Sequence, residues 1–245
     1  MKVLGLIPAR GGSKSIPKKS IIDLAGFPML AYSIAAGKMS KMIDRVIVST
    51  DSMEIAEAGR KYGAEVPFLR PAEYAQDDSP DIEYIRHAIQ WILSNEGEIP
   101  DLIVQLRPTT PFRDPEVIDC AINNFCENTQ ASSLRSAHQA SESPFKWFLL
   151  SEDGFFKSLK ENCSNDDANL PRQSFPEVYI PNGYVDIIRT KTVLEQNALY
   201  GNTMMGFVTK PCYEVDCPED VSFLEYQLAT SKSPILEYLN ANFVK

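Results

Sequence analysis

The sequence contains few of the side chains on which nucleophilic and zinc-dependent enzymes rely. There are two histidines in 245 residues, and neither His87 nor His138 has a partner at the spacing of a metal site or a catalytic triad. The five cysteines are an odd number without a CxxC pair, so we expect reduced thiols rather than zinc ligands or disulfides. Ser49 lacks the flanking pattern of a nucleophile elbow. The composition therefore favours chemistry without a covalent nucleophile.

Long apolar runs and a net positive charge are also absent. No apolar stretch approaches the length that spans a bilayer, and the chain does not open with the pattern of a secretion signal. We therefore expect a cytoplasmic protein with no membrane partner. The net charge is −9, from 33 acidic residues against 24 Lys and Arg, which argues against nucleic acid as a partner. An acidic protein that binds an anion needs a local basic pocket.

Apolar and amphipathic segments alternate along the chain. Short apolar runs predict strands at residues 2–7, 45–50, 65–69, 102–106, 183–188 and 204–208. Segments with apolar residues on one face predict helices at residues 28–39, 53–62, 81–94, 115–128 and 219–230. This alternation predicts an α/β fold, with a mostly parallel sheet and helices on both faces. Ligands of such sheets bind beyond the carboxyl ends of the strands.

The pattern changes after residue 130. Residues 132–175 contain polar loops and two aromatic clusters but no long helix, and we interpret them as an inserted flap or dimer arm. The rest is predicted to be one domain over residues 1–231 and a C-terminal tail over residues 232–245. The last dozen residues are expected to form a loosely attached helix. A chain of 245 residues is long enough for one domain with a substantial core.

The first loop carries most of the functional information. An apolar run ends at Pro8, and the loop that follows holds Arg10, Lys14 and Lys19 on a Gly- and Ser-rich backbone. It is not a Walker loop, because Pro17 follows the glycines where that motif would start a helix. An extended loop around a triphosphate fits better, with backbone N–H groups and cations on the phosphate oxygens. A solvated basic turn is the alternative.

The stretch IPARGGSKSIPKKS resembles the signature of the CMP-sialic acid synthetases, the acylneuraminate cytidylyltransferase family. VIVSTDSMEIAEAGRKYGAEVPFLRPAEYAQDDSP, RPTTPFR, PRQ, PNG and VDCPED follow in family order over about residues 3–228. The resemblance implies a three-layer, Rossmann-like nucleotide-sugar transferase fold with a mixed sheet, a small inserted dimerisation subdomain and a homodimer. It also implies that CTP and a nine-carbon 2-keto-3-deoxy sugar acid, of the sialic, legionaminic or pseudaminic type, give the CMP-sugar and pyrophosphate with Mg²⁺ as cofactor.

The resemblance assigns the nucleotide contacts residue by residue. They are Ala9, Arg10, Gly11, Gly12, Ser13, Lys14, Lys19 and Ser20 in the first loop, Arg70, and then Asp78, Ser79 and Asp81 in the loop that reads the cytosine. Arg10, Lys19 and Asp216 are expected to be catalytic. Asp216 and Glu214 match the family's metal-binding carboxylates, and such a pair would hold Mg²⁺ together with substrate phosphates. An acidic turn that caps the next helix is the alternative for Glu214.

The sugar side departs most from the family pattern. The resemblance places the sugar acid against Arg107, Thr109, Lys146, Arg172 and Asn182. Sialic acid enzymes of the family carry Gln at the position of Arg107, and some carry Arg at that of Ile180. We therefore expect Arg107 to supply the cation for the sugar carboxylate. A cytidylyltransferase for an eight-carbon sugar acid or a phosphonate stays open, as does a catalytically silent nucleotide-binding protein. The RPTTP stretch counts against the eight-carbon enzymes, which show Gly-Asp-Glu-Pro near the fourth strand.

Overall fold

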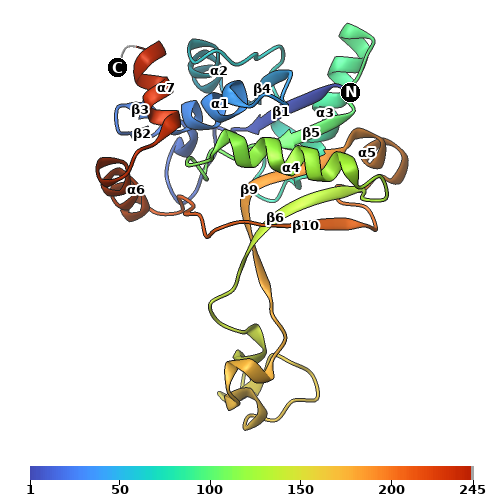
Figure 1. Ribbon diagram of the computed structural model, residues 1–245, viewed down its shortest axis with the longest axis vertical. Coiled ribbons are helices and arrows are strands. Elements are labelled where there is room, and N and C mark those ends of the chain that lie inside the picture. Colours follow the sequence, from blue (N-terminus) through green and yellow to red (C-terminus); the bar gives the residue numbers. More distant parts are fainter. Residues whose placement is uncertain (244–245) are drawn as a thin grey trace.

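The computed structural model describes residues 1–243 and has a central six-stranded sheet (Figure 1). Its strands, in spatial order, are β10 (Met204–Val208), β6 (Ser133–Gln139), β9 (Tyr179–Arg189), β5 (Leu102–Gln105), β1 (Val3–Pro8) and β4 (Arg45–Ser49). β1 is parallel to β4 and β5, and β10 is parallel to β6. β9 is antiparallel to both of its neighbours. The expected mixed, mostly parallel sheet is confirmed.

Helices cover both faces of this sheet and bury two separate apolar cores. The first core receives side chains from α1 (Met29–Met39), α2 (Met53–Lys61), α4 (Pro115–Glu127), α6 (Pro218–Thr230) and α7 (Pro234–Asn242). The second receives them from α3 (Asp81–Glu96) and α5 (Thr190–Gln196). In α3, Ile85, Ile89 and Ile92 are buried because their spacing places them on one helical face. The three layers of the expected fold are therefore present.

Shorter elements complete the chain. β2 (Asp23–Leu24) pairs with β3 (Phe27–Pro28), and β7 (Phe148–Leu150) pairs with β8 (Phe156–Ser158). Single 3₁₀ turns occur at η1 (Lys19–Ile21), η2 (Ala72–Tyr74), η3 (Pro144–Lys146), η4 (Asp167–Asn169) and η5 (Arg172–Ser174). Of these, η1 and η2 lie near the candidate site, η1 in the loop after β1 and η2 in the segment between α2 and α3.

The predicted strand at residues 65–69 is wrong. Only Glu65 forms a bridge, to Ile47 of β4, and residues 66–69 lie outside any strand. The physical reason is Pro67, which has no N–H group for a strand ladder. The segment still follows the sheet edge, since Arg70 N–H donates to the carbonyl of Thr50.

The projecting arm is shorter than residues 132–175 and begins later. Residues 133–139 form β6, which lies inside the main sheet between β9 and β10. β9 starts at Tyr179, earlier than the predicted strand at Gly183. The segment between them, residues 140–178, hangs away from the helices and is called the arm below (Figure 1). β6 was missed because the alternate residues of SLRSAHQ are polar, and only Leu134 reads as a core residue.

The C-terminal segment packs more firmly than predicted. Ile235 and Leu239 of α7 are buried in the first core, and α7 lies against α1. The last two residues of the predicted tail, 244–245, lie outside the described residues. Among residues 1–243, no helix combines the length and the apolar character that a membrane crossing needs.

Candidate active site

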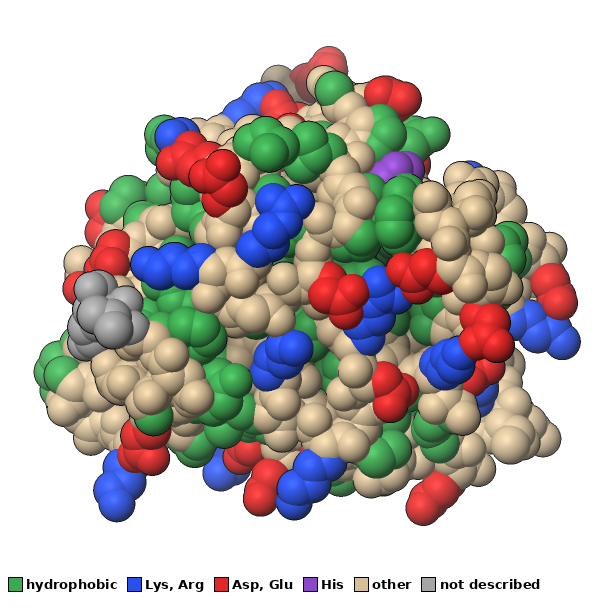
Figure 2. Space-filling view, turned by 90° about the horizontal axis from the view of Figure 1, so that it is seen from above, with side chains coloured by type: hydrophobic (Ala, Val, Ile, Leu, Met, Phe, Trp, Pro, Cys, Tyr) green, Lys and Arg blue, Asp and Glu red, His purple; other side chains and the backbone are tan. Residues whose placement is uncertain are grey.

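A cavity of about 320 Å³ lies where the loops after β1 and β5 meet the segment between α2 and α3. The predicted site residues that line it are Arg10, Ser13, Lys19, Ser20, Arg70, Ser79, Asp81, Arg107 and Thr109. Asp77, which begins the loop expected to read the cytosine, also lines it. The lining residues that were not assigned from the sequence are Pro8, Tyr74, Gln76, Tyr84 and Pro108. The strand-end argument therefore located the cavity. On the face away from the arm, acidic and basic side chains are interspersed (Figure 2). The basic side chains that can bind an anion are therefore distinguished by their individual contacts.

Asp77 joins the first loop to the loop that follows Arg70. Arg10 donates to the Gln76 carbonyl at 2.6 Å and is ion-paired to Asp77 at 3.0 Å. Lys14 lies 2.6 Å from the other oxygen of the same carboxylate. The contacts with Lys14 and then Arg10 hold the pKa of Asp77 below its usual range. Two predicted phosphate-binding cations thus share a carboxylate, whose place a phosphate can take.

The glycine backbone of the first loop is also engaged by a carboxylate. Gly11 N–H donates to Asp51 at 2.7 Å, and a Cβ at Gly11 would lie 3.2 Å from Ser52. A Cβ at Gly12 would meet nothing within 4 Å, so only Gly11 is needed for close approach. Ala9 is fully buried, and its N–H donates to the Ser49 carbonyl. Ala9 is not among the residues that line the cavity, so its predicted nucleotide contact stays a prediction.

Arg70 is one of the most buried cations of the cavity. It is 5% exposed and donates to the Ser49 hydroxyl at 3.1 Å and to the Ser49 carbonyl at 2.6 Å. Its guanidinium lies 4.6 Å from the ring centre of Tyr84. Burial lowers the pKa of Arg70. This arginine has no carboxylate within ion-pair distance among the described residues, so it contributes a fixed charge that a nucleotide can use.

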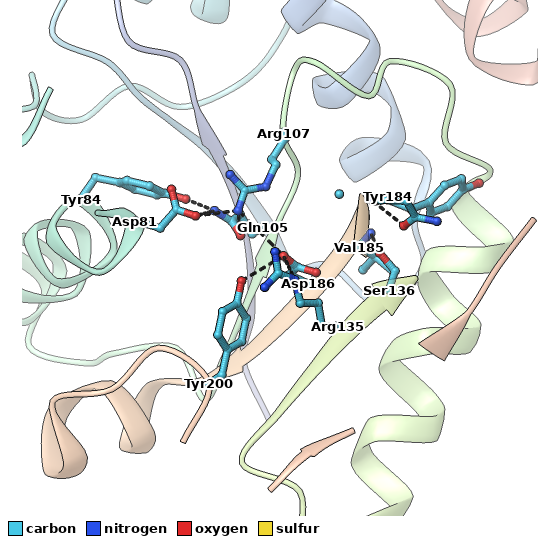
Figure 3. Close-up of polar contacts among 12 residues, drawn as sticks. Asp81, Tyr84, Gln105, Arg107, Arg135, Ser136, Tyr184, Val185, Asp186 and Tyr200 are labelled. Carbon is cyan, nitrogen blue, oxygen red and sulfur yellow. Dashed lines mark hydrogen bonds and ion pairs between the residues drawn. The ribbon is translucent and has the colours of Figure 1, made fainter. Parts of the chain in front are cut away.

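Arg107 is held inside the protein by a polar network (Figure 3). It donates to Asp81 at 2.5 Å and to the Gln105 side-chain oxygen at 3.1 Å. Gln105 in turn donates to Asp81 at 3.1 Å and to the Tyr84 hydroxyl. Asp186 lies 3.9 Å from Arg107 on the other side. The charge predicted to bind the sugar carboxylate is therefore already compensated by two aspartates.

Arg113 was missed from the sequence but organises the wall of the site. It is 2% exposed and donates to the carbonyls of Arg107 at 2.7 Å, Gly183 at 2.9 Å, Tyr184 at 2.6 Å and Thr110. Burial lowers its pKa to about 10, so it remains charged near neutral pH. These bonds hold the loop after β5 against Gly183 and Tyr184 of β9. A signal existed, because the resemblance motif RPTTPFR ends at this residue.

The two predicted metal ligands lie on either side of a buried residue. Val215 is fully buried and bonded to Thr109, with its N–H 2.8 Å from the carbonyl oxygen. Lys19 donates to the Val215 carbonyl at 2.9 Å and to Asp216 at 3.2 Å. A Cβ at Gly183 would lie 2.8 Å from a Glu214 oxygen. Burial and then Asp216 raise the pKa of Glu214.

This donor set suits magnesium only in combination with a phosphate. Within residues 1–243 no three His, Cys, Asp or Glu side chains gather into a metal site. Glu214 and Asp216 nevertheless offer oxygen ligands at the edge of the cavity where Lys19 lies. Mg²⁺ commonly takes one or two carboxylates and completes its shell with water and phosphate oxygens. The residues therefore fit Mg²⁺ bound with a nucleotide.

Several predicted residues do not line the cavity within one chain. Lys146 and Arg172 lie on the arm, where they donate to the carbonyls of Leu170 and Ala140. Asn182 is buried, and its side chain is used by Thr209 and the Tyr184 N–H. Asp78 is exposed and also lies outside the cavity lining. Their predicted contacts with substrate stay predictions.

The fold and the cation-lined cavity are those of a nucleotide-binding α/β transferase. The family model described as cytidylyltransferase matches residues 4–186. The chain therefore belongs to the cytidylyltransferase family, and the family and enzyme class expected from the sequence are confirmed.

Named relatives narrow this similarity. The chain is 32% identical over 230 residues to post-translational flagellin modification protein B of Campylobacter coli, covering 92% of this chain and 94% of the relative. It is 30% identical over 237 residues to the CMP-N,N'-diacetyllegionaminic acid synthase of Legionella pneumophila, covering 92% and 95%. A solved CMP:2-keto-3-deoxy-manno-octonic acid synthetase complexed with CTP superposes with a TM-score of 0.69 at 16% identity, covering 94% of this chain and 99% of that one. This last likeness concerns the fold alone.

Proposed function

We propose that this protein transfers CMP from CTP to the anomeric hydroxyl of a nine-carbon 2-keto-3-deoxy sugar acid. The observation that carries the proposal is one cavity at the strand ends lined by Arg10, Lys19, Arg70 and Arg107. Such a concentration of cations in a protein with a net charge of −9 suits an anionic substrate. The names of the relatives support a nonulosonic acid as the acceptor.

The nucleotide would enter by replacing internal carboxylates. Asp77 neutralises Arg10 and Lys14, and Asp216 neutralises Lys19. Phosphate oxygens make charge-assisted bonds with the same groups, so CTP binding exchanges one set of anions for another. Arg70 needs no exchange. Its fixed position beside Tyr84 suits the nucleoside end of the substrate.

The reaction would be a direct displacement. The anomeric oxygen bonds to the α-phosphorus, the bond to the bridging oxygen breaks, pyrophosphate leaves, and the hydroxyl proton passes to solvent. Arg10, Lys14 and Lys19 stabilise the charge that develops on the leaving group. A magnesium ion on Asp216 and Glu214 would supply Lewis-acid stabilisation of the phosphates. The protein's contribution is mainly positioning and electrostatics.

The arm supports a homodimer as the working assembly. It exposes large apolar side chains, namely Trp147, Phe148, Leu149, Leu150, Phe155 and Phe156. Contiguous exposed apolar surface commonly marks an interaction site. Lys146 and Arg172 lie on the same arm. The predicted sugar contacts and the predicted dimer arm are compatible if the arm of a second copy reaches the cavity.

Pyrophosphate release from CTP with a panel of acceptors tests the function. We expect Mg²⁺-dependent turnover with N-acetylneuraminate, N,N'-diacetyllegionaminate or pseudaminate. Turnover only with an eight-carbon sugar acid or a phosphonate would support the related cytidylyltransferase instead. CTP binding without product from any acceptor would support a silent nucleotide-binding protein.

Sedimentation velocity tests the assembly. Leu150→Glu on the arm should shift a dimer to monomer, because it places a charge on the apolar surface. Leu93→Glu is the matched control, since Leu93 is also exposed but lies on α3. A wild-type protein that sediments as a monomer at all concentrations contradicts the homodimer.

A further inference from the structure

A second polar cluster adjoins the cavity on the side of β6 and β9. Asp186 of β9 is 2% exposed and lies opposite Arg135 of β6 in the register. Its Oδ2 atom is 3.9 Å from Arg107 and 4.0 Å from Arg135, so both guanidinium groups approach the same oxygen. The Tyr200 hydroxyl donates to this oxygen at 3.4 Å. Figure 3 shows these side chains converging beside Arg107, which itself lines the cavity.

Arg135 differs from the other arginines near the site because its donors are unused. It makes no hydrogen bond within residues 1–243, and its Nε is buried without a partner. Its side chain is 34% exposed, and its guanidinium lies 4.9 Å from the Tyr200 ring centre. Asp186 and Tyr200 therefore fix the orientation of a guanidinium that can still donate to a ligand.

There is room for a ligand group beside this guanidinium. Gly206 of β10 is the register partner of Arg135 on the other side of β6. A Cβ at Gly206 would meet no atom of residues 1–243 within 4 Å. Since paired residues of neighbouring strands point to the same side of a sheet, the space next to Arg135 is open.

The charges of the cluster indicate what kind of group binds there. Arg107 and Arg135 are balanced by Asp81 and Asp186, so the cluster has no net charge to attract an anion. The free N–H groups of Arg135 still require an oxygen acceptor. A neutral carbonyl meets that need, and the neighbouring Tyr200 ring offers apolar contact to an attached methyl group.

We propose that Arg135, oriented by Asp186 and Tyr200, recognises an acylamino carbonyl of the sugar acid and determines acceptor specificity. This inference rests on the proposed function, because it assigns a substituent of that acceptor to a place beside the cavity. It separates two roles on the sugar side. The acceptor carboxylate needs a net cation, whereas this cluster reads a neutral substituent.

The test compares acceptors that differ only in one group. Each acylated acid that the wild-type enzyme uses, among N-acetylneuraminate, N,N'-diacetyllegionaminate and pseudaminate, is paired with analogues carrying hydroxyl in place of an acetamido group. One charged hydrogen bond corresponds to a preference of about 10- to 100-fold in kcat/KM for the acylated member. In Arg135→Met, kcat/KM for that member should fall by this factor, while the hydroxyl analogue and the KM for CTP change by less than about threefold.

Two further variants separate recognition from folding. Arg135→Lys keeps the charge but loses the planar fork, so its acyl preference should lie between those of the wild type and Arg135→Met. Arg189→Met is the matched control, because Arg189 also stands on a strand of the sheet with its guanidinium 4.4 Å from an aromatic ring centre, that of Phe125. Unlike those of Arg135, its donors are bonded to backbone carbonyls, those of Ala131 and Asn128, so Arg189→Met should lower Tm without changing the preference.

The experiment distinguishes a failure of the proposed function from a failure of the inference about Arg135. A wild-type enzyme that turns over none of the three acids refutes the proposed function, and this inference with it. An active wild-type enzyme with no acyl preference refutes the inference alone. The same holds if both Arg135→Met and Arg135→Lys retain the wild-type preference, or if Arg135→Met loses activity equally with both members of the pair.

Discussion

Lys19 is the residue whose removal most directly tests the triphosphate site. Its side chain is 12% exposed and bridges the first loop to residues 215–216, with bonds of 2.9 Å to the Val215 carbonyl and 3.2 Å to Asp216. Lys19→Met removes the ammonium and keeps most of the apolar stem. A charge-assisted hydrogen bond to the leaving phosphate contributes about 1.5–3 kcal/mol. We therefore expect kcat/KM for CTP to fall about 10- to 100-fold.

The effect on folding should be modest. Asp216 is 76% exposed, so its pair with Lys19 is screened by solvent and contributes at most about 1 kcal/mol to the free energy of unfolding. The Val215 carbonyl also loses its bond to Lys19, which costs about another 1 kcal/mol. Lys18→Met is the matched control. Lys18 is the preceding residue, and within residues 1–243 its one ion-pair partner is Glu54; both side chains are exposed. Steady-state pyrophosphate release and thermal unfolding of the three proteins separate the two effects. If Lys19→Met keeps wild-type kcat/KM, or Lys18→Met loses as much, the assignment of Lys19 is refuted.

Three other perturbations follow from the wall of the site. Arg113→Met should lower the free energy of unfolding by about 3 kcal/mol, because it leaves several buried carbonyls without a donor. Arg60→Met loses one bond and should lower the free energy of unfolding far less. Chemical denaturation measures both values, and equal losses would contradict the argument. Gly183→Ala and Gly97→Ala both place alanine at positive φ, which should lower the free energy of unfolding by about 1–2 kcal/mol in each variant. The Cβ at position 183 also meets Glu214 and Thr110, so only Gly183→Ala should lower kcat as well. Burial raises the pKa of Glu214, so the Mg²⁺ concentration for half-maximal activity should increase as pH falls, starting at a pH above the ordinary carboxyl range. This pH dependence should vanish in Glu214→Gln and persist in Glu214→Asp. An unchanged pH profile in Glu214→Gln would exclude Glu214 as a ligand.

The parts of the fold that a reader of the sequence can predict are those with a strong local signal. β1, β4 and β5 are nearly continuous apolar runs, and α3 shows isoleucines at helical spacing. Because the loops after parallel strands meet at one edge of a sheet, the loops that hold Arg10 and Arg107 could be placed at one edge from strand order and charge. Arg70 was assigned from the family resemblance, since it follows no strand.

The remaining features depend on partners that are distant in sequence. β6 was missed because most of its residues are polar and Leu134 is its one large apolar side chain. Arg113 reads as an ordinary surface arginine until the carbonyls of β9 surround it. Arg107 was predicted as a free cation, yet Asp81 lies 2.5 Å away. Such contacts arise from tertiary packing, for which a single sequence carries no periodic signal.

The arm is continuous with the strands that carry the polar cluster. β6 and β9, the strands that carry Arg135 and Asp186, are the same two that run out of the sheet to become its stem. Their pairing has an irregular register between Arg135 and Ala137, between the cluster and the arm. The arm is therefore joined to the proposed acceptor wall by unbroken backbone. In the proposed homodimer, the surface that would pair two copies and the residue that would select the acceptor share one pair of strands.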